Sequence, residues 1–562
     1  MLFFNDNYLK LNNMGIKHFF MWYKNNMKST MHSFAKHTTL KDKNISIDNL
    51  LLDLNGNIHN SAQKIFKYGN HAPPKRFLAN KQPTVINNNQ QTRNILYQDV
   101  CLAIENLLKV VDPKKRLLLC IDGPAPLGKQ NQQRQRRFRA ASESTVNEVF
   151  DSNCITPGTT FMDELSIYID SYIVKRRKES EKWKQIEVIF SDEKVPGEGE
   201  HKAVEFVRNH GTEEESYCIN GPDADLFMLA LATHKPNFYI LREDSFDPLN
   251  EFFCVDVKQT RKVLIEKLKW ENDNHQFNER QAINDFVFMC FAVGNDFLPH
   301  VPSIEIIENG VEMMIEIYKN TGKKVGHITS INSKGKVSIN KDALYSFFTT
   351  IGQCELENFE NKLSSKVNFF PDQIMLNHSH RDEKGKWHLD LESYTHEYNE
   401  VHFENDSWQQ QERVCHQYIQ GLQWVITYYT TGCPSWNWYY PYQYAPMAKT
   451  ISDHIKTYST PRYGVTKPSL PFQQLLSVLP PKSSHLLPNP LNKCLNDKNS
   501  KMARFCPEKI TIDLAGKRRE WEGITIIPMV DQKIVNEICK KNIQLVDEID
   551  LKRNISHNYK KY

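Results

Sequence analysis

The side chains best suited to chemistry in this sequence are seven carboxylates, which stand where apolar runs end or helices would begin. They lie in the segments LLLDLNG, LLLCIDG, VPGEGEH, GPDADL and GNDFLPH, and are Asp53, Asp122, Glu198, Glu200, Asp223, Asp225 and Asp296. An apolar run that ends in an acid is typical of a parallel strand that presents a side chain at the carboxyl edge of its sheet. Five such segments in order between residues 53 and 296 predict one shared acidic pocket.

Carboxylates gathered in one pocket repel one another unless cations neutralise them, and oxygen ligands favour Mg²⁺ or Mn²⁺. Hard cations held in this way commonly act on phosphate groups. A helix cap is the alternative interpretation of each acid, because Asp and Glu are favoured at the start of helices. The capping interpretation must be correct independently at each of the five segments, including the close pairs Glu198/Glu200 and Asp223/Asp225. A single metal site explains all seven acids at once.

A basic segment, LGKQNQQRQRRFRAA over 127–141, follows soon after Asp122 in the sequence. On a helix, positions i, i+4, i+7 and i+8 share one face, and here these are Lys129, Gln133, Arg136 and Arg137. Guanidinium and amide groups suit a terminal phosphate with several acceptor oxygens. A solvated helix face is the alternative, but closeness to Asp122 favours a phosphate pocket beside the acids.

An aromatic segment, PSWNWYYPYQYAP over 434–446, contains Trp436 and Trp438. Most of its rings are expected to pack in the core, since aromatic side chains dominate cores. One or two at the mouth of a pocket could stack on nucleic-acid bases without selecting among them.

Strand-like and helix-like patterns alternate up to about residue 310. The apolar run around Asp53 is interpreted as the first strand (47–58, ending at Asp53), and 14–32 as an amphipathic helix. This alternation predicts an α/β fold in which a Rossmann-like, mostly parallel sheet is flanked by helices. The last acid, Asp296, is expected at the end of a helix over INDFVFMCFAVGNDFLPH.

The pattern changes after residue 310, and we predict four segments. Residues 1–13 are an N-terminal extension, 14–310 a catalytic domain, 311–344 a hairpin-like connection, and 345–562 a second, mainly helical domain packed on the first. The second domain includes HQYIQGLQWVITYYT, which reads as a strongly apolar helix.

Composition sets wider limits. The 562 residues, 40% of them hydrophobic and 25% charged, fit a globular protein with more than one domain. The 12 cysteines form no CxxC pair, which favours reduced thiols and excludes zinc-knuckle spacing. No apolar stretch reaches the roughly 18 residues of a membrane span, and the N-terminus is too polar for a signal peptide. The cytoplasm is the expected compartment, with the nucleus as the alternative.

Ten segments, in order from about residue 14 to 531, carry a family resemblance. Among them are MGIKHFFMW, LLLDLNGNIH, IDGPAPLGKQNQQRQRRFR, DSNCITPGTTFM, FSDEKVPGEGEHK, GPDADLFMLALATH and GLQWVITYYTTGCPSWNWYYPYQYAP. The sequence resembles the Xrn-type 5′→3′ exoribonucleases, a branch of the flap-nuclease superfamily, and looks like a minimal version of their catalytic core. The resemblance implies a PIN/flap-nuclease-like fold and Mg²⁺-dependent, processive release of mononucleotides from single-stranded RNA with a 5′-monophosphate.

The resemblance also assigns roles. The family's metal-binding acids match all seven acids named above, which would hold two Mg²⁺ ions, with Mn²⁺ as a possible substitute. Its 5′-phosphate pocket matches Lys129, Gln133, Arg136 and Arg137, and its base-stacking histidine matches His59. A stacking tryptophan lies in SWNW, where Trp436 and Trp438 remain alternatives. The chain is expected to act as a monomer.

Some positions depart from the family pattern. Residues 1–13 precede Met14, where members normally begin, so Met14 is an alternative start. Asn284 stands where the family usually has Asp, Asn57 stands where it has an apolar residue, and Gln443 stands where it usually has His. We expect these three substitutions to tune activity. Two other functions are alternatives. A structure-specific DNA nuclease would lack the basic helix and the aromatic segment, both of which this sequence contains. A non-catalytic scaffold that binds RNA ends should have lost some of the acids, and none is lost here.

Overall fold

A computed structural model describes residues 16, 18–35, 37–72, 88–143, 150–243, 250–271, 274–365, 370–460 and 463–562. The extension 1–13 lies outside the described residues. The centre of the fold is an eight-stranded mixed sheet with the order β1-β7-β6-β5-β2-β3-β4-β14. Five of its six inner strands are parallel to one another: β6 (Asn237–Glu243), β5 (Ser216–Asn220), β2 (Asn49–Asp53), β3 (Arg116–Cys120) and β4 (Glu187–Ser191). The α/β class with a mostly parallel sheet is therefore confirmed.

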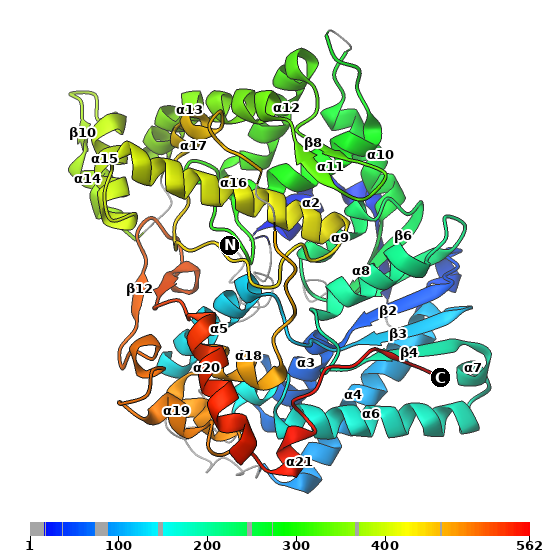
Figure 1. The fold of residues 1–562 in the computed structure, drawn as a ribbon. Helices are drawn as coiled ribbons and strands as arrows, with labels where there is room; N and C mark the ends of the chain where they lie inside the picture. Colours follow the sequence, from blue (N-terminus) through cyan, green and yellow to red (C-terminus); the bar gives the residue numbers. More distant parts are fainter. Residues whose placement is uncertain are drawn as a thin grey trace, which may run out of the picture.

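Helices cover both faces of this sheet because its strands are apolar on both sides. Leu50 and Leu52 of β2 pack in one core with α4 (Gln90–Val111) and α6 (Thr160–Glu179). Leu51, which points the other way, packs in a second core with α8 (Gly199–His210), α9 (Asp225–Ala232) and α11 (Glu279–Cys290). In Figure 1, α4 and α6 lie below the sheet and α8 lies above it.

The second core continues into a helical region over residues 310–454. This region contains α12 (Gly310–Val325), α13 (Lys341–Ser364), α15 (Leu391–His402), α16 (Trp408–Thr430) and α17 (Ala448–His454). The hairpin of β8 (Thr329–Ile331) and β9 (Val337–Ile339) lies inside the segment predicted as a hairpin-like connection. Since α16 shares one core with α9 and α11, the helical region packs directly on the sheet region.

The C-terminal segment, residues 463–562, returns to the sheet region. Its helix α18 (Pro471–Val478) packs on α5 (Leu127–Glu143) and on α20 (Gln532–Asn542). Its last strand, β14 (Lys560–Lys561), pairs antiparallel with β4 at the sheet edge. The four predicted segment boundaries themselves stay predictions.

Two local predictions were wrong, and one predicted range was too long. The helix expected over 14–32 is only α2 (Phe19–Asn26), and Met31–Ala35 form the edge strand β1, which pairs antiparallel with β7 (Asn250–Asp256). The first predicted strand ends at Asp53 as expected, but residues 54–58 of its predicted range begin α3 (Leu54–Phe66), which Asp53 caps by accepting a hydrogen bond from the Asn55 N–H at 3.3 Å. Helix α11 ends at Cys290, so Asp296 lies in a loop.

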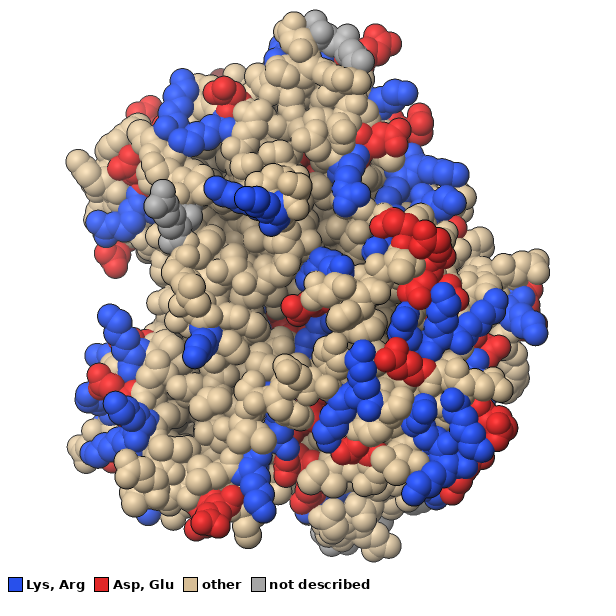
Figure 2. Space-filling model, turned by 45° about the vertical axis from the view of Figure 1, so that its right-hand side comes forward, with Lys and Arg blue, Asp and Glu red and all other residues tan. Residues whose placement is uncertain are grey.

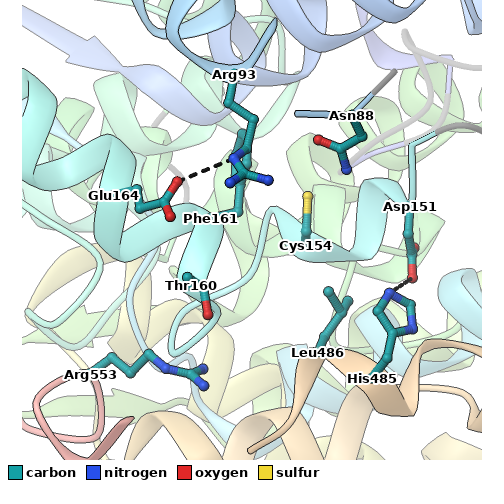
Figure 3. Close-up of a pocket in the computed structure, with 10 residues that line it drawn as sticks. All are labelled: Asn88, Arg93, Asp151, Cys154, Thr160, Phe161, Glu164, His485, Leu486 and Arg553. Carbon is teal, nitrogen blue, oxygen red and sulfur yellow. Dashed lines mark ion pairs between the residues drawn. The ribbon is translucent and has the colours of Figure 1, made fainter. Parts of the chain in front are cut away.

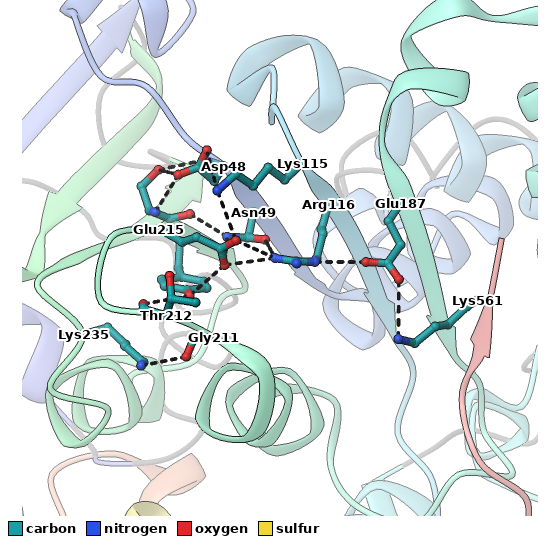
Figure 4. A network of polar contacts seen from close by, with 12 residues as sticks. Asp48, Asn49, Lys115, Arg116, Glu187, Gly211, Thr212, Glu215, Lys235 and Lys561 are labelled. Carbon is teal, nitrogen blue, oxygen red and sulfur yellow. Dashed lines mark hydrogen bonds and ion pairs between the residues drawn. The ribbon is translucent and has the colours of Figure 1, made fainter.

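At the amino ends of the parallel strands, a polar network ties neighbouring strands together (Figure 4). Arg116 of β3 pairs with Glu187 of β4 at 3.0 Å and with Glu215 at 2.9 Å. Glu187 in turn pairs with Lys561 of β14 at 3.5 Å. This network fixes the register at the end of the sheet opposite to the acids. Within the described part of the chain, no helix is long and apolar enough to cross a membrane.

Candidate active site

Six of the seven predicted acids lie at the carboxyl ends of strands or in the segments that follow them, whereas Asp296 lies in the loop after α11. Asp53 ends β2, and Asp122 follows β3. Glu198 and Glu200 stand at the start of α8, and Asp223 and Asp225 stand between β5 and the first residue of α9. The parallel sheet therefore collects acids from distant segments, as the sequence predicted.

Three of these acids form a group that could hold a metal ion. Asp53, Asp122 and Glu200 each offer a carboxylate oxygen, and these oxygens lie within 4.8 Å of one another. Gly199 makes this approach possible, because a Cβ there would lie 2.5 Å from the Asp53 Oδ1 atom. The Gly199 N–H also donates to the Asp122 Oδ1 atom at 2.7 Å. Three carboxylate oxygens fit Mg²⁺ or Mn²⁺, which prefer oxygen ligands.

The other acids are held by donors of the protein. The Lys129 Nζ atom lies 2.6 Å from the Glu198 Oε2 atom and 2.5 Å from the Asp296 Oδ2 atom. Tyr428 and Tyr429 of α16 donate their hydroxyl hydrogens to Glu198 and Asp225, respectively. In contrast, the Asp223 Oδ1 atom is buried and accepts no hydrogen bond from the described residues.

Burial and mutual repulsion disfavour ionisation of these acids. Burial, followed by the charges of Asp122 and Asp223, raises the pKa of Asp53 well above its ordinary value. Burial is also the main cause that raises the pKa of Asp223 to about 6 and that of Asp225 to about 7. Although burial acts in the opposite direction, Asp296 and Glu198 raise the pKa of Lys129 well above its usual range. A site of this kind gains free energy when a divalent cation replaces its protons.

The predicted phosphate-binding residues lie on α5, but they do not all face the same neighbours. Lys129 turns toward the acids, whereas Gln133 and Arg137 are buried and Arg136 is exposed. The Arg137 Nη1 atom is buried and has no hydrogen-bond partner among the described residues. Burial, followed by the charge of Arg136, lowers the pKa of Arg137 to about 9. A buried guanidinium with an unused N–H is suited to an anion that arrives from outside.

His59 of α3 lies close enough to these arginines to be affected by their charge. Burial, followed by the charges of Arg136 and Arg137, lowers the pKa of His59 to about 3. The imidazole is therefore neutral at physiological pH, and its ring is available for stacking rather than for charge pairing.

The structure separates the two candidate tryptophans. Trp438 is only 7% exposed and stacks on Trp424 of α16, with ring centroids 5.2 Å apart. Trp436 is half-buried, and its carbonyl accepts a hydrogen bond from the Leu127 N–H at 2.9 Å. Trp436 therefore lies at the start of α5, beside the predicted phosphate pocket, and is the better placed of the two.

Sequence reasoning missed three residues that shape the site. One is Lys202, whose ammonium group is buried and donates to the carbonyls of Ile121, Asp192 and Val195 at 2.6, 2.8 and 2.9 Å. It ties the end of β3 to the loop before Glu198. The other two are Tyr428 and Tyr429, whose segment has the sequence pattern of an apolar helix. Two adjacent hydroxyl groups near the end of that helix were the only sequence signal that it reaches a polar site.

The three departures from the family pattern lie outside the acid group. The Asn284 side chain contacts His234, with 2.8 Å between Oδ1 and Nε2. The Gln443 Oε1 atom accepts a hydrogen bond from Gln135 at 2.6 Å. The Asn57 Nδ2 atom is buried without a hydrogen-bond partner among the described residues. The expectation that they tune activity stays a prediction.

A separate cavity of about 350 Å³ lies between α4, α6 and the segment around His485 (Figure 3). It contains the ion pair Arg93–Glu164 at 3.2 Å, and the His485 ring lies 3.7 Å from the Asp151 carboxylate. None of the predicted site residues lines it. On the face drawn in Figure 2, basic and acidic side chains are interspersed, so surface charge there marks no single-sign region.

Comparisons with known proteins identify the family of the chain. A family model described as the Xrn 5′-3′ exonuclease N-terminus matches residues 14–244, and one described as the Xrn1 helical domain matches residues 276–388 and 350–560. A relative from Drosophila melanogaster, "5′-3′ exoribonuclease 2 homolog", is 31% identical over 96% of this chain and 72% of its own length. "5′-3′ exoribonuclease 2" of Candida albicans is 27% identical, over 91% of this chain and 69% of its own length. The chain belongs to the Xrn 5′-3′ exonuclease family.

Among solved structures, the catalytic core of Rad2 in complex with a DNA substrate matches with a TM-score of 0.31 and 12% sequence identity. That match covers 64% of this chain and 82% of the other.

Proposed function

We infer that this chain is a 5′-3′ exoribonuclease, a hydrolase that removes nucleoside monophosphates from the 5′ end of RNA. Family membership supports the activity, and one structural observation carries the proposal for this chain. The acidic pocket lies next to α5, because Lys129 of α5 contacts Glu198 and Asp296 directly. This contact supports a hydrolytic centre and a group of phosphate-binding side chains within one site.

We propose that Asp53, Asp122 and Glu200 hold Mg²⁺, and that Asp223 and the remaining acids complete a site for two ions. The bound ions would stabilise the charge that develops on the scissile phosphate and the leaving oxygen. The chain's own contribution is geometric: Gly199 lets the carboxylates approach one another, and Lys202 fixes the loop that carries them.

The end of the RNA is selected by α5. Gln133, Arg136 and Arg137 would bind the 5′-monophosphate through charge-assisted hydrogen bonds, and this fixes the scissile bond one nucleotide away. Because Gln133 and Arg137 are buried, a larger 5′-triphosphate should fit poorly, and a 5′-hydroxyl would leave the guanidinium without a partner. His59 and Trp436 would stack on the leading bases of single-stranded RNA of any sequence.

The proposal is tested with three end-labelled single-stranded RNAs of one sequence in Mg²⁺, carrying a 5′-monophosphate, a 5′-hydroxyl or a 5′-triphosphate. The wild-type chain should degrade the monophosphate RNA fastest, and Asp122→Asn should abolish its degradation. Equal rates on all three ends would contradict the phosphate pocket. Degradation of a matched DNA alone would support the DNA-nuclease alternative, and binding without cleavage would support the scaffold. A cytoplasmic location is proposed on composition alone and is tested by imaging the tagged chain.

A further inference from the structure

Two adjacent tyrosines at the end of α16 reach the acidic pocket from the helical region. The Tyr428 hydroxyl donates to the Glu198 Oε1 atom at 3.0 Å, and the Tyr429 hydroxyl donates to the Asp225 Oδ2 atom at 2.8 Å. Both tyrosines are buried, at 4% and 0% exposed. More than 200 residues separate each tyrosine from its acid in the chain, so these contacts join the two regions at the site itself.

Packing around the rings fixes where the hydroxyls point. The ring of His201, in α8, stacks on Tyr428 with centroids 3.7 Å apart and planes at 10°, and it lies edge-on to Tyr429 at 5.1 Å. Phe291 and Phe297 pack edge-on against Tyr429 and Tyr428 at 5.1 and 5.7 Å. Because neither ring can turn away without opening the core, the two hydroxyls are rigid donors.

The two acids are also held from their other sides. The Ile16 N–H donates to the Asp225 Oδ1 atom at 3.1 Å, and the Lys129 ammonium group lies 2.6 Å from the Glu198 Oε2 atom. Each carboxylate is therefore bound at both oxygens by groups from elements other than its own. Partners of this kind set the orientation and basicity of metal ligands in proteins.

We propose that Tyr428 and Tyr429 are positioning residues of the metal site, which hold Glu198 and Asp225 in the orientation that divalent-cation binding requires. The helical region is then part of the metal-binding machinery rather than only a cover for the sheet. This inference rests on the proposed function and extends it, since it names what fixes the acids outside the group of Asp53, Asp122 and Glu200.

The test is the affinity of the full chain for Mn²⁺, measured by titration with the electron paramagnetic resonance signal of free Mn²⁺. Tyr428→Phe and Tyr429→Phe each remove one hydroxyl and keep the ring. Loss of such a partner should weaken Mn²⁺ binding by about tenfold or more. Tyr418→Phe is the matched control, because Tyr418 lies on the same helix, is fully buried and donates to the Pro299 carbonyl at 3.0 Å.

A second measurement separates positioning from general damage. If the tyrosines position metal ligands, raised Mg²⁺ should restore the RNA-degrading activity of Tyr428→Phe and Tyr429→Phe. Unchanged Mn²⁺ affinity in both variants would overturn the inference, as would equal weakening in Tyr418→Phe. A wild-type chain that binds no Mn²⁺ would overturn the metal site and the proposed function with it, whereas wild-type binding with unaltered variants would overturn the tyrosine inference alone.

Discussion

Lys129 lies between Glu198 and Asp296, whereas Asp53, Asp122 and Glu200 turn their carboxylates toward one another. A lysine ammonium group is a fixed charge of the protein, so it neutralises part of the pocket at all times. Burial raises the pKa of Asp53 and the pKa of Glu200 well above their ordinary values. The acids that face one another therefore need a cation from solution in order to be ionised together. Lys129 thus neutralises part of the negative charge of the pocket, and the rest is left to metal ions.

The raised pKa values of these acids give a pH dependence of stability. The pKa of Asp225 is raised from 3.8 to about 7, so on raising the pH the unfolded chain loses this proton first, and stability falls up to about pH 7. His59 contributes the opposite slope, since its pKa is lowered to about 3. The comparison must therefore be made between the wild-type chain and Asp225→Asn.

Without metal, the thermal midpoint of Asp225→Asn should rise relative to the wild-type midpoint as the pH is raised from about 5 to about 8. Added Mg²⁺ should shrink this difference by neutralising the carboxylate. A difference that stays constant across this range would contradict the assigned pKa.

Arg136 should determine the preference for a 5′-monophosphate. Arg136→Ala removes charge-assisted hydrogen bonds, which should lower kcat/KM on 5′-monophosphate RNA by about 10- to 100-fold. The rate on 5′-hydroxyl RNA should change little. The control is Arg139→Ala, since Arg139 of the same helix donates instead to the carbonyls of Glu520 and Gly523. Equal losses on both RNAs would remove Arg136 from the phosphate pocket.

Among the elements, the turn between β4 and α8 brings the acids together most closely. Gly199→Ala would place a Cβ 2.5 Å from the Asp53 Oδ1 atom, so either Asp53 or α8 must move. We expect nearly complete loss of Mg²⁺-dependent cleavage with a folded chain, measured by activity together with circular dichroism. Gly464→Ala is the control, because its Cβ would meet open space. Full activity of Gly199→Ala would show that this close approach is not required.

The elements also show how much the sequence could predict. The runs LLLD and LLLC identify β2 and β3, because a strand buried on both faces is a continuous apolar run. The edge strands β1 and β14 and the inner strand β7 were missed; β1 and β14 pair with strands far along the chain, and β14 has only two residues. Helical periodicity placed Lys129 on the face of Gln133, and closeness to Asp122 predicted acids beside that face, but the sequence could not show that Lys129 itself contacts Glu198 and Asp296. That information exists only in the packed structure.

At the scale of the whole molecule, α5 joins the sheet region to the C-terminal segment. Arg134 is 1% exposed, and its guanidinium donates to the carbonyls of Ser477 and Phe505. Arg134→Met should lower the free energy of unfolding by about 3 kcal/mol, because it leaves two buried carbonyls without donors. Chemical denaturation measures this loss, and a change no larger than that of Arg139→Ala would contradict the assigned role of the contact.

The central claim is that one site binds the 5′ phosphate and hydrolyses the first phosphodiester bond of RNA. The most direct test is a time course in Mg²⁺ with single-stranded RNA that carries a labelled 5′-monophosphate. The labelled mononucleotide should be the first and only labelled product, and it should be absent with Asp122→Asn or with EDTA. Labelled products longer than one nucleotide at early times, or release that persists in Asp122→Asn, would contradict the central claim.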